Sequence, residues 1–230
     1  MPNAIITGAS RGLGLALARA LATDGWRLTI DARTGSELER AARELGRHTE
    51  VVALAGDQAD PAHRQALVSA AGPAIDLLVN NAGVLGPSPQ PPLATYPIDM
   101  LERVYRINVL APLALTQLVL PRLTTRGTII TITSDAAVEA YPGWGGYGSA
   151  KAALDQLTAT LAAEHPGLRI YAADPGDLRT RMHQEAFPGE DISDRPLPET
   201  AVPGLVALIT GDHPSGRYRL QEALATGAGA

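Results

Sequence analysis

Cysteine is absent from the 230-residue sequence, and aromatic residues make up only 4% of it, with a single phenylalanine. Without cysteine the chain can form no disulfide, no thiolate nucleophile and no cysteine-ligated metal site. The five histidines are scattered without the spacing of metal ligands, so we expect no metal. The absence of disulfides fits a cytoplasmic location.

Long apolar runs and an excess of positive charge are also missing. No apolar stretch reaches the ~20 residues that a membrane-spanning helix requires, and the start of the chain leads directly into a strand-like segment, without a basic leader. The formal net charge of −5 argues against a nucleic-acid surface, which requires a basic stripe. We therefore expect neither membrane nor nucleic acid as a partner, and local groups must hold any anionic ligand.

Short apolar segments alternate with helical segments along the whole chain. The expected strands cover residues 4–7, 28–30, 51–54, 75–79, 128–133, 168–172 and 217–220, and the expected helices cover residues 13–23, 36–45, 61–71, 99–120, 148–164 and 199–210. This β-α-β-α order predicts an α/β fold, a doubly wound parallel β-sheet with helices on both faces. The length and the 45% hydrophobic content predict one domain over residues 1–230.

Two segments interrupt this alternation. Residues 84–97 contain five prolines, and residues 177–198 are rich in charge, glycine and proline, so neither fits a regular helix or a central strand. Ligands bind outside the carboxyl ends of the strands in an open parallel sheet, and both segments follow a strand. We expect them to form the walls and lid of a site, with plain surface loops as the alternative. The small, alanine-rich tail over 221–230 is expected to be flexible.

Tyr147 and Lys151 stand four residues apart where a helix is expected to open, so they project from one face. A free tyrosine has a pKa near ~10 and is a poor acid or base at neutral pH. A cation about 4 Å away, at an effective dielectric constant of about 20, favours the phenolate by about 4 kcal/mol, or about 3 pK units. Such a shift would bring the phenol into the range of general acid–base catalysis, although the same spacing also occurs on solvated helix faces.

A glycine-rich turn joins the first expected strand to the first expected helix, with the sequence Thr7-Gly8-Ala9-Ser10-Arg11-Gly12-Leu13-Gly14. Glycines allow a tight turn and bring a pyrophosphate close to the free N–H groups of the helix N-terminus, where the helix dipole favours anions. Its position between a strand and a helix predicts a dinucleotide site, although the G-x-x-x-G-x-G spacing differs from the commoner G-x-G-x-x-G.

The glycine turn resembles the T-G-x-x-x-G-x-G cofactor loop of the short-chain dehydrogenase/reductase family. Five further elements resemble that family, in order, along nearly the whole chain: Asn80-Asn81-Ala82-Gly83, Asn108, Ser134, the pair Tyr147 and Lys151, and Pro175-Gly176-Asp177-Leu178-Arg179-Thr180. Because several elements at compatible spacing are a specific signal, the chain is identified as a member of this family. The resemblance implies a single NAD(P)-binding, Rossmann-like domain.

The resemblance also implies a role for each residue. The implied catalytic residues are Asn108, Ser134, Tyr147 and Lys151. Ser134 would stabilise the substrate oxygen and Tyr147 would exchange its proton. Lys151 would lower the tyrosine pKa and hold a ribose, and Asn108 would order a relay water. As alternatives, Ser134 could cap a turn at the end of its strand, and the Asn108 amide could be purely structural. The implied cofactor-binding residues are Gly8, Ser10, Arg11, Gly12, Leu13, Gly14, Arg33, Asp57, Gln58, Asn80, Ala82, Gly83, Tyr147, Lys151, Pro175, Gly176, Leu178 and Thr180, with a capping role as the alternative for Asp57.

Cofactor choice depends on the end of the second strand. In the family, an acidic residue at the position of Ala32 selects NAD, and a base one place later favours the 2′-phosphate of NADP. Here that base is Arg33, with Arg11 as a second candidate. A charge-assisted hydrogen bond is worth about 1.5–3 kcal/mol, or about 10- to 100-fold in preference. We therefore expect NADP(H), whereas a register shift of one residue would bring Asp31 to the ribose and favour NAD(H).

The expected substrate is a small carbonyl compound or alcohol with an apolar or ring-bearing surface. Although aromatic residues are scarce, several fall near the implied catalytic residues or in the expected lid, and such surfaces bury large areas of a ligand. The expected pocket residues are Tyr141, Trp144, Met182 and Phe187, with ordinary loop packing as the alternative. Asp135, Glu139 and Asp177 could instead bind polar groups of the substrate.

The leading hypothesis is an NADPH-dependent carbonyl reductase or alcohol dehydrogenase. The alternatives are a lyase or epimerase that uses bound cofactor without net redox turnover, and a nucleotide-sensing protein without catalysis. The helices expected over 99–120 and 148–164 match those that pair between subunits in the family, so we expect a homodimer or homotetramer.

Overall fold

The computed structural model describes residues 1–221, so residues 222–230 of the tail expected to be flexible lie outside the described residues. Within the described range, parallel strands form a seven-stranded sheet in the order β3-β2-β1-β4-β5-β6-β7. The strands are β1 (Asn3–Ile6), β2 (Arg27–Ala32), β3 (Val51–Ala55), β4 (Ile75–Asn80), β5 (Leu123–Ile132), β6 (Arg169–Asp174) and β7 (Gly216–Arg219). The predicted doubly wound parallel sheet is confirmed.

The direction of strand addition reverses between β1 and β4, which are paired at the centre of the sheet. The first part of the chain builds outward from β1 through β2 to β3, and the second part builds in the other direction, from β4 to β7. All six strand pairs are parallel, so the carboxyl ends lie along one edge of the sheet. Ligand crevices form at such a reversal, where neighbouring connections pass to opposite faces.

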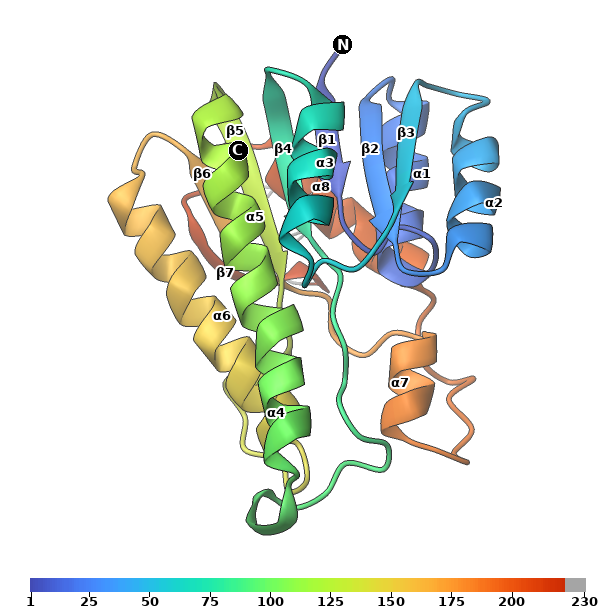
Figure 1. Ribbon diagram of the computed structural model, residues 1–230, viewed down its shortest axis with the longest axis vertical. Helices are drawn as coiled ribbons and strands as arrows, with labels where there is room; N and C mark the ends of the chain where they lie inside the picture. The colour runs from blue at the N-terminus through green and yellow to red at the C-terminus, as the bar shows by residue number, and fades with distance from the viewer. Residues whose placement is uncertain (222–230) are drawn as a thin grey trace.

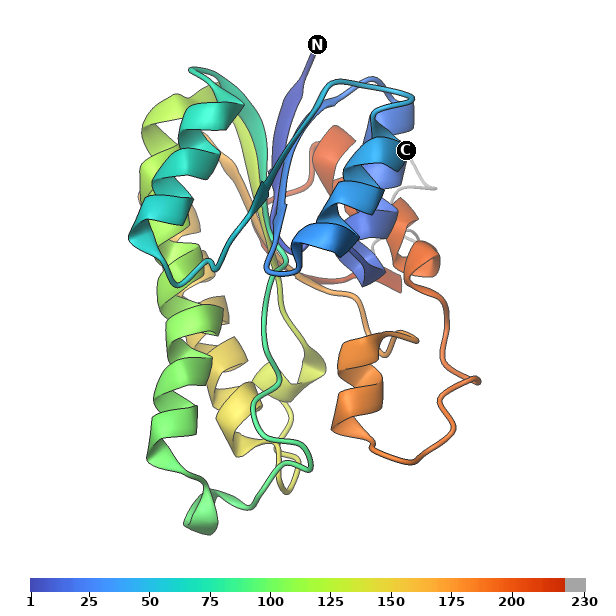
Figure 2. The same ribbon diagram turned by 45° about the vertical axis from the view of Figure 1, so that its right-hand side comes forward.

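Helices cover both faces of the sheet (Figure 1, Figure 2). One face carries α1 (Gly12–Thr23), α2 (Gly35–Leu45) and α8 (Val202–Thr210), and the other carries α3 (Pro61–Ala71), α5 (Ala111–Val119) and α6 (Gly145–Glu164). Because side chains alternate along a strand, Ile6 and Ile130 pack into the core under the first group of helices. Their neighbours Ile5 and Ile129 pack under the second group.

A long helical run crosses the second face. The segments α4 (Ile98–Tyr105), η2 (Arg106–Leu110), α5 and η3 (Leu120–Arg122) follow one another without a break, which confirms the helix predicted over 99–120, and η2 is a π-helical turn. By length and composition, the run Ile98–Arg122 could cross a membrane, and 50% of its most apolar window is buried inside the protein. Val104, Leu115 and Val119 are fully buried, as in the core helix of a globular domain.

The two irregular segments lie beyond the carboxyl ends of β4 and β6. The first contains the short turn η1 (Leu93–Thr95), and the second contains the helix α7 (Arg181–Ala186) before η5 (Pro198–Ala201) leads into α8. The expectation that residues 177–198 hold no helix is therefore wrong. Thr180 caps α7 by accepting a hydrogen bond from the His183 N–H at 3.2 Å. Figure 2 shows α7 beyond the end of the sheet, facing the loop that follows β4.

Candidate active site

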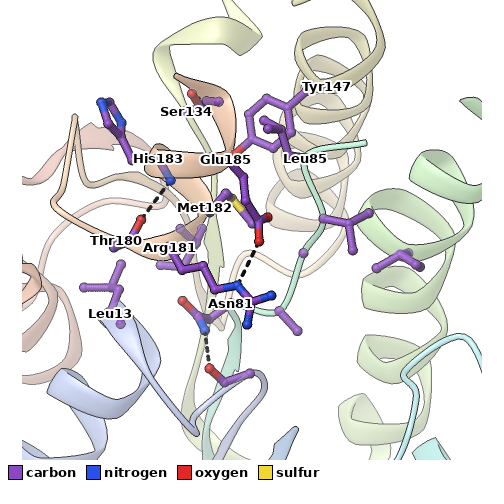
Figure 3. A pocket seen from close by; sticks show the side chains of 18 of the residues that line it. Leu13, Asn81, Leu85, Ser134, Tyr147, Thr180, Arg181, Met182, His183 and Glu185 are labelled. Atoms are coloured by element: carbon purple, nitrogen blue, oxygen red, sulfur yellow. Dashed lines mark hydrogen bonds and ion pairs between the residues drawn. The ribbon is translucent and has the colours of Figure 1, made fainter. Parts of the chain in front are cut away.

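A cavity of about 840 Å³ lies at the carboxyl ends of the strands and reaches from the turn after β1 to α7 (Figure 3). Its volume falls within the range of about 300–1,000 Å³ that is typical of ligand pockets. Most of the predicted cofactor-binding residues line it: Gly8, Ser10, Arg11, Gly12, Leu13, Arg33, Asp57, Gln58, Ala82, Gly83, Tyr147, Lys151, Pro175, Gly176, Leu178 and Thr180. Ser134 lines it as well.

The glycine turn is held against the loop after β4 by Thr7 and Asn81. The Asn81 amide donates to the carbonyls of Thr7 (2.7 Å) and Gly8 (3.2 Å), and the Thr7 hydroxyl accepts the N–H groups of Asn81 and Ala82. Gly8 has a φ of +67°, and a Cβ there would lie 3.0 Å from the Ala82 Cα. A Cβ at Gly14 would lie 2.5 Å from the Asn81 Nδ2, so Gly14 is required for packing beneath the cavity.

The N-terminus of α1 opens into the cavity at Gly12 and Leu13. The first backbone N–H groups of a helix have no intrahelical partner, and the helix dipole adds positive potential there. Gly12 also leaves the approach open, since the nearest atom to a Cβ built on it is the Thr180 methyl at 3.7 Å. These residues fit the diphosphate of a dinucleotide.

Asn80 does not take the predicted role at the cofactor. Its side-chain amide donates to the Thr116 hydroxyl of α5 at 3.1 Å, and Asn80 is only 4% exposed. The alternation of side chains along β4 turns Asn80 toward α5, whereas Asn81 reaches the cavity. Sequence reasoning passed over Asn81, although it belongs to the same motif.

Asn108 occupies the π-helical turn η2 and is 1% exposed. Its Oδ1 accepts the Val84 N–H at 2.9 Å, and its Nδ2 donates to the Val84 carbonyl at 2.8 Å. A Cβ at Gly83 would lie 3.2 Å from this Oδ1 and 3.9 Å from the Lys151 Nζ. The structural role of Asn108 is thus established, and Gly83 separates it from Lys151; the relay water stays a prediction.

Ser134 follows β5 and caps the turn η4 (Asp135–Ala137), where its hydroxyl accepts the Ala136 N–H at 3.2 Å. The same hydroxyl donates to the Asp135 carboxylate at 2.9 Å, and Tyr141 donates to the other oxygen of that carboxylate at 3.0 Å. A hydroxyl hydrogen can rotate, so a substrate oxygen would compete with Asp135 for the Ser134 proton. Asp135 is therefore part of the site, because its carboxylate accepts the hydrogen bond of the Ser134 hydroxyl.

Lys151 and Tyr147 lie on adjacent turns of α6, with the Lys151 Nζ 5.6 Å from the centroid of the Tyr147 ring. Lys151 is 5% exposed, and its ammonium donates to the Ile132 carbonyl at the end of β5 at 2.7 Å. Burial lowers the pKa of Lys151 to about 8, and the Asp155 carboxylate opposes this shift. The predicted pairing of the two side chains on one helix face is present.

The pKa of Tyr147 shifts in the direction opposite to the one expected. Burial of the phenol raises the pKa, the carboxylates of Asp135 and Asp174 raise it further, and hydrogen bonding to Ser134 acts against them. The expected lowering by Lys151 is wrong for this arrangement, because desolvation of the phenolate outweighs a cation that donates to a backbone carbonyl. The phenol is therefore protonated at neutral pH.

Asp31 lies behind the glycine turn and is 1% exposed. Its Oδ1 accepts the Gly8 N–H at 2.8 Å, and its Oδ2 accepts from Gln58 at 3.3 Å and lies 3.0 Å from the His63 Nε2. The carboxylate is thus engaged within the protein, although Asp31 also lines the cavity, and the choice between NADP(H) and NAD(H) stays a prediction. His63 was not identified from the sequence, because nothing local links it to a residue one strand away.

The basic groups near the expected 2′-phosphate position differ in their contacts. β2 ends at Ala32, and the next residue, Arg33, is exposed at the cavity and has no ion pair or hydrogen bond within residues 1–221. Arg11 is committed to Glu37, to which it donates at 2.9 Å. Arg33 is therefore the cation that is available to a ligand.

Asp57 lines the cavity just after β3, and its carboxylate accepts the Ala59 N–H at 2.8 Å. The residue that caps α3 is Asp60, which accepts the Ala62 N–H at 2.9 Å. The alternative role considered for Asp57, capping the next helix, belongs to Asp60, and Asp57 stays a candidate contact for an adenine.

The lid segment covers Tyr147 with apolar side chains. A cluster joins Leu85, Ala136, Trp144, Tyr147, Met182 and Ala186. The Trp144 ring lies 5.9 Å from the Tyr147 ring and 5.8 Å from the Phe187 ring, centroid to centroid. Of the four predicted pocket residues, Trp144 and Met182 line the cavity, whereas Phe187 supports Trp144 from the lid and Tyr141 is bound to Asp135.

The fold and this site together define a dinucleotide-dependent oxidoreductase: a glycine turn at a helix N-terminus, at the switch point of a parallel sheet, joined by one cavity to a buried Ser-Tyr-Lys group. The family model described as short chain dehydrogenase matches residues 2–191. The chain belongs to the short-chain dehydrogenase family, and it is an NAD(P)-dependent dehydrogenase/reductase.

Individual relatives belong to the same class of dehydrogenases and reductases. The chain is 34% identical over 203 residues to a 2-(R)-hydroxypropyl-CoM dehydrogenase of Xanthobacter autotrophicus, covering 84% of this chain and 81% of the relative. It is 35% identical over 201 residues to the sepiapterin reductase of Mus musculus, covering 79% and 76%. Among solved structures, a short-chain dehydrogenase from Shigella flexneri in complex with NADP superposes with a TM-score of 0.87 at 28% identity, covering 96% of this chain and 97% of that one.

The position of Asp31 predicts the effect of the variant Asp31→Asn. Loss of the carboxylate weakens the support of the Gly8 N–H, so the affinities for NADPH and NADH should fall together, by about 3- to 30-fold, the range of one or two hydrogen bonds. Fluorescence titration of both nucleotides gives the two dissociation constants. Asp24→Asn, at an exposed position after α1, is the control. A large loss for NADH alone would place Asp31 at the ribose.

Lys151 is the only lysine of the chain, so its titration can be observed directly. In the cofactor-free protein labelled with ¹³C-lysine, the single side-chain signal should titrate with a pKa of about 8. After unfolding in urea the same signal should titrate near ~10.4, the ordinary lysine value. A folded-state value near the unfolded one would mean that the ammonium is hydrated, in conflict with its burial.

Proposed function

We propose that the protein catalyses the NADPH-dependent reduction of a carbonyl group on a small, apolar or ring-bearing substrate. The observation that carries this proposal is the buried, protonated phenol of Tyr147, which shares one cavity with the N-terminus of α1. A group that retains its proton at neutral pH is suited to donate it to an oxygen that gains negative charge. Because the phenol carries its proton at neutral pH, it can give that proton to the carbonyl oxygen in the direction of reduction.

The nicotinamide supplies the hydride when the cofactor is bound. Tyr147 gives its proton to the carbonyl oxygen, and Ser134 donates a hydrogen bond to the same oxygen after its hydroxyl turns away from Asp135. Lys151 holds a ribose hydroxyl and stabilises the phenolate that remains after the proton transfer. Because it donates one of its hydrogens to the Ile132 carbonyl, its ammonium has two further donors for these roles.

Two features support the proposed substrate class. The relatives include a sepiapterin reductase and a 2-(R)-hydroxypropyl-CoM dehydrogenase, names that imply a carbonyl compound or a secondary alcohol as the reacting group. In this chain, Trp144 and Met182 give the cavity an apolar wall beside Tyr147. A ring or alkyl group stacked on that wall would bury apolar surface and exclude water from the reacting atoms.

Preference for NADPH is supported by Arg33, a cation just after β2 whose side chain has no ion pair or hydrogen bond within residues 1–221, and by the NADP bound to the similar Shigella flexneri protein.

We further propose a cytoplasmic homodimer or homotetramer that pairs through α4, α5 and α6. Leu110, between α4 and α5, is 57% exposed, so part of this helical face is apolar and open to a second copy.

Tyr147→Phe tests the proposed reaction, because the change keeps the ring and removes the proton donor. A screen of aromatic and aliphatic ketones, followed by nicotinamide absorbance, should find turnover with NADPH that falls by at least about 100-fold in Tyr147→Phe, the size typical of a lost acid. Tyr105→Phe, on α4, is the matched control and should retain activity. Full activity of Tyr147→Phe would exclude Tyr147 as the donor; tight NADPH binding without turnover in the native protein would favour a lyase, an epimerase or a nucleotide sensor.

Arg33→Ala tests the cofactor preference. The dissociation constant of NADPH should rise by about 10- to 100-fold, the value of one charge-assisted hydrogen bond, whereas that of NADH should change little. Arg43→Ala is the control, since Arg43 is 72% exposed on the outer surface of the neighbouring α2. Equal losses for both nucleotides would show that Arg33 does not read the 2′-phosphate.

A further inference from the structure

Arg217 joins the chain segments that carry the reacting groups, although it lies on the edge strand β7, far from them in sequence. Its Nε donates to Asp155 of α6 at 3.1 Å. Its Nη2 donates both to Asp174, the last residue of β6, at 2.9 Å and to the backbone carbonyl of Ser134 at 3.0 Å. One planar guanidinium thus links α6, the end of β6 and Ser134, which lies two residues after the end of β5.

Two of these partners, Ser134 and Asp174, line the cavity, and the third, Asp155, lies on the helix of Tyr147 and Lys151. Asp155 lies one helical turn after Lys151, and the Asp174 carboxylate also accepts the Gly176 N–H at 3.0 Å, at the start of the Pro175–Thr180 loop. The carbonyl of Ser134 is part of the peptide group that joins it to Asp135, and the Asp135 carboxylate accepts a hydrogen bond from the Ser134 hydroxyl. The contacts of Arg217 therefore act on the serine, on the helix of the tyrosine and lysine, and on the loop expected at the nicotinamide.

Arg217 lies between two of the carboxylates near the reacting groups. Two cations, Lys151 and Arg217, face two carboxylates, Asp155 and Asp174, whose side chains are 15% and 4% exposed. Removal of one partner from a buried charge pair leaves an uncompensated charge, which costs more than the pair itself contributes. The Arg217 side chain is 26% exposed, so water screens it only in part.

We propose that Arg217 is a positioning residue for the reaction: it fixes Ser134 relative to Tyr147 and neutralises the two carboxylates behind the reacting groups. The expected effect of Arg217 on turnover rests on the proposed function, whereas its expected effect on the pKa of Lys151 does not depend on that function. Arginine suits the place because its fork of N–H groups can bind two carboxylates and a carbonyl in one plane. A lysine would supply the charge without this geometry.

The charge balance has a measurable consequence in the cofactor-free protein. The charged and titratable groups that surround Lys151 and Tyr147 are Asp135 from η4, Asp155 on α6, Asp174 from β6 and Arg217 from β7. Loss of the Arg217 cation removes the ion-pair partner of both Asp155 and Asp174. Both carboxylates favour the protonated form of their neighbours, so the pKa of Lys151 and the pKa of Tyr147 should both rise.

The experiment compares Arg217→Gln with Arg126→Gln, a matched control because Arg126 is 82% exposed at the other end of β5. Both variants keep Lys151 as the only lysine, so its ¹³C signal reports the pKa without any substrate. In Arg217→Gln the pKa of Lys151 should rise by about 0.5–1 unit, the effect of a unit charge about 10 Å away at an effective dielectric constant of about 20–40. In Arg126→Gln it should not change. An unchanged pKa in folded Arg217→Gln would overturn the proposed charge balance.

Turnover provides the second readout. In Arg217→Gln, kcat should fall by about 10- to 100-fold while the dissociation constant of NADPH changes by less than about 3-fold, because the glycine turn and Arg33, which would bind the diphosphate and the 2′-phosphate, do not depend on the contacts of Arg217. Arg217→Lys should restore the pH profile but only part of kcat, because it returns the charge without the fork. An unchanged pH profile with lower protein stability would reduce Arg217 to a sheet-edge contact and overturn the proposal.

A folding failure of Arg217→Gln leaves the test intact through Asp155→Asn, which removes one charge while Arg217 keeps Asp174 and the Ser134 carbonyl. Because the Asp155 carboxylate raises the pKa of Lys151, this pKa should fall in Asp155→Asn. An unchanged Lys151 pKa would contradict the proposed charge balance. If the native protein reduces no carbonyl compound at all, the proposed function fails, whereas the Lys151 titration still decides the role of Arg217.

Discussion

The hydrogen bond from the Lys151 ammonium to the Ile132 carbonyl connects the helix that carries Tyr147 to the strand end that carries Ser134. A hydrogen bond to a charged group contributes about 1.5–3 kcal/mol, which offsets part of the cost of removing the ammonium from water. The offset is incomplete, because burial still lowers the pKa of Lys151 to about 8. The site is therefore held in a state that the isolated side chains would avoid, and the surrounding fold supplies the difference. Such groups persist at functional positions because the rest of the structure determines their place.

The parallel sheet explains why so few residues can support a site of this size. Strand ends that are remote in sequence meet along one edge, so the turn after β1, the loop after β4, Ser134 and the Pro175–Thr180 loop all face one cavity. Each strand end leaves backbone groups exposed, and side chains from neighbouring segments bind them. Asn81 does this for the glycine turn, Asn108 for Val84 and Arg217 for Ser134. The same layout brings the glycine turn and the Ser134, Tyr147 and Lys151 side chains to one cavity, and the edge strand β7 contributes the Arg217 contact to Ser134.

Features encoded in short stretches of sequence could be predicted, whereas features that depend on contacts between strands could not. The sheet, its helices, the glycine turn and the pairing of Tyr147 with Lys151 each follow from local pattern, and the structure has all of them. The direction of Asp31 depends on the exact end of β2 and on His63 from α3, and the choice between Asn80 and Asn81 depends on which side of β4 each faces. The tyrosine pKa is not predictable from spacing for another reason: spacing indicates a neighbouring cation but not the loss of water around the phenol, which dominates. Spacing in a sequence contains no information about desolvation.

The lid segment packs against the Tyr147 phenol and influences its acidity. Met182 and Ala186 of α7 belong to the cluster that covers Tyr147, and the Ser88 hydroxyl ties the lid to the loop after β4 by donating to the Glu185 carbonyl at 2.6 Å. Tyr147 is 7% exposed under this cover, so a substrate that reaches the phenol must displace these side chains. Entry of water beside the phenol would relieve the desolvation that raises the tyrosine pKa, whereas an apolar ligand surface on Trp144 would preserve it. The apolar cover from α7 and Trp144 thus makes the Tyr147 phenol a weaker acid than it would be in water.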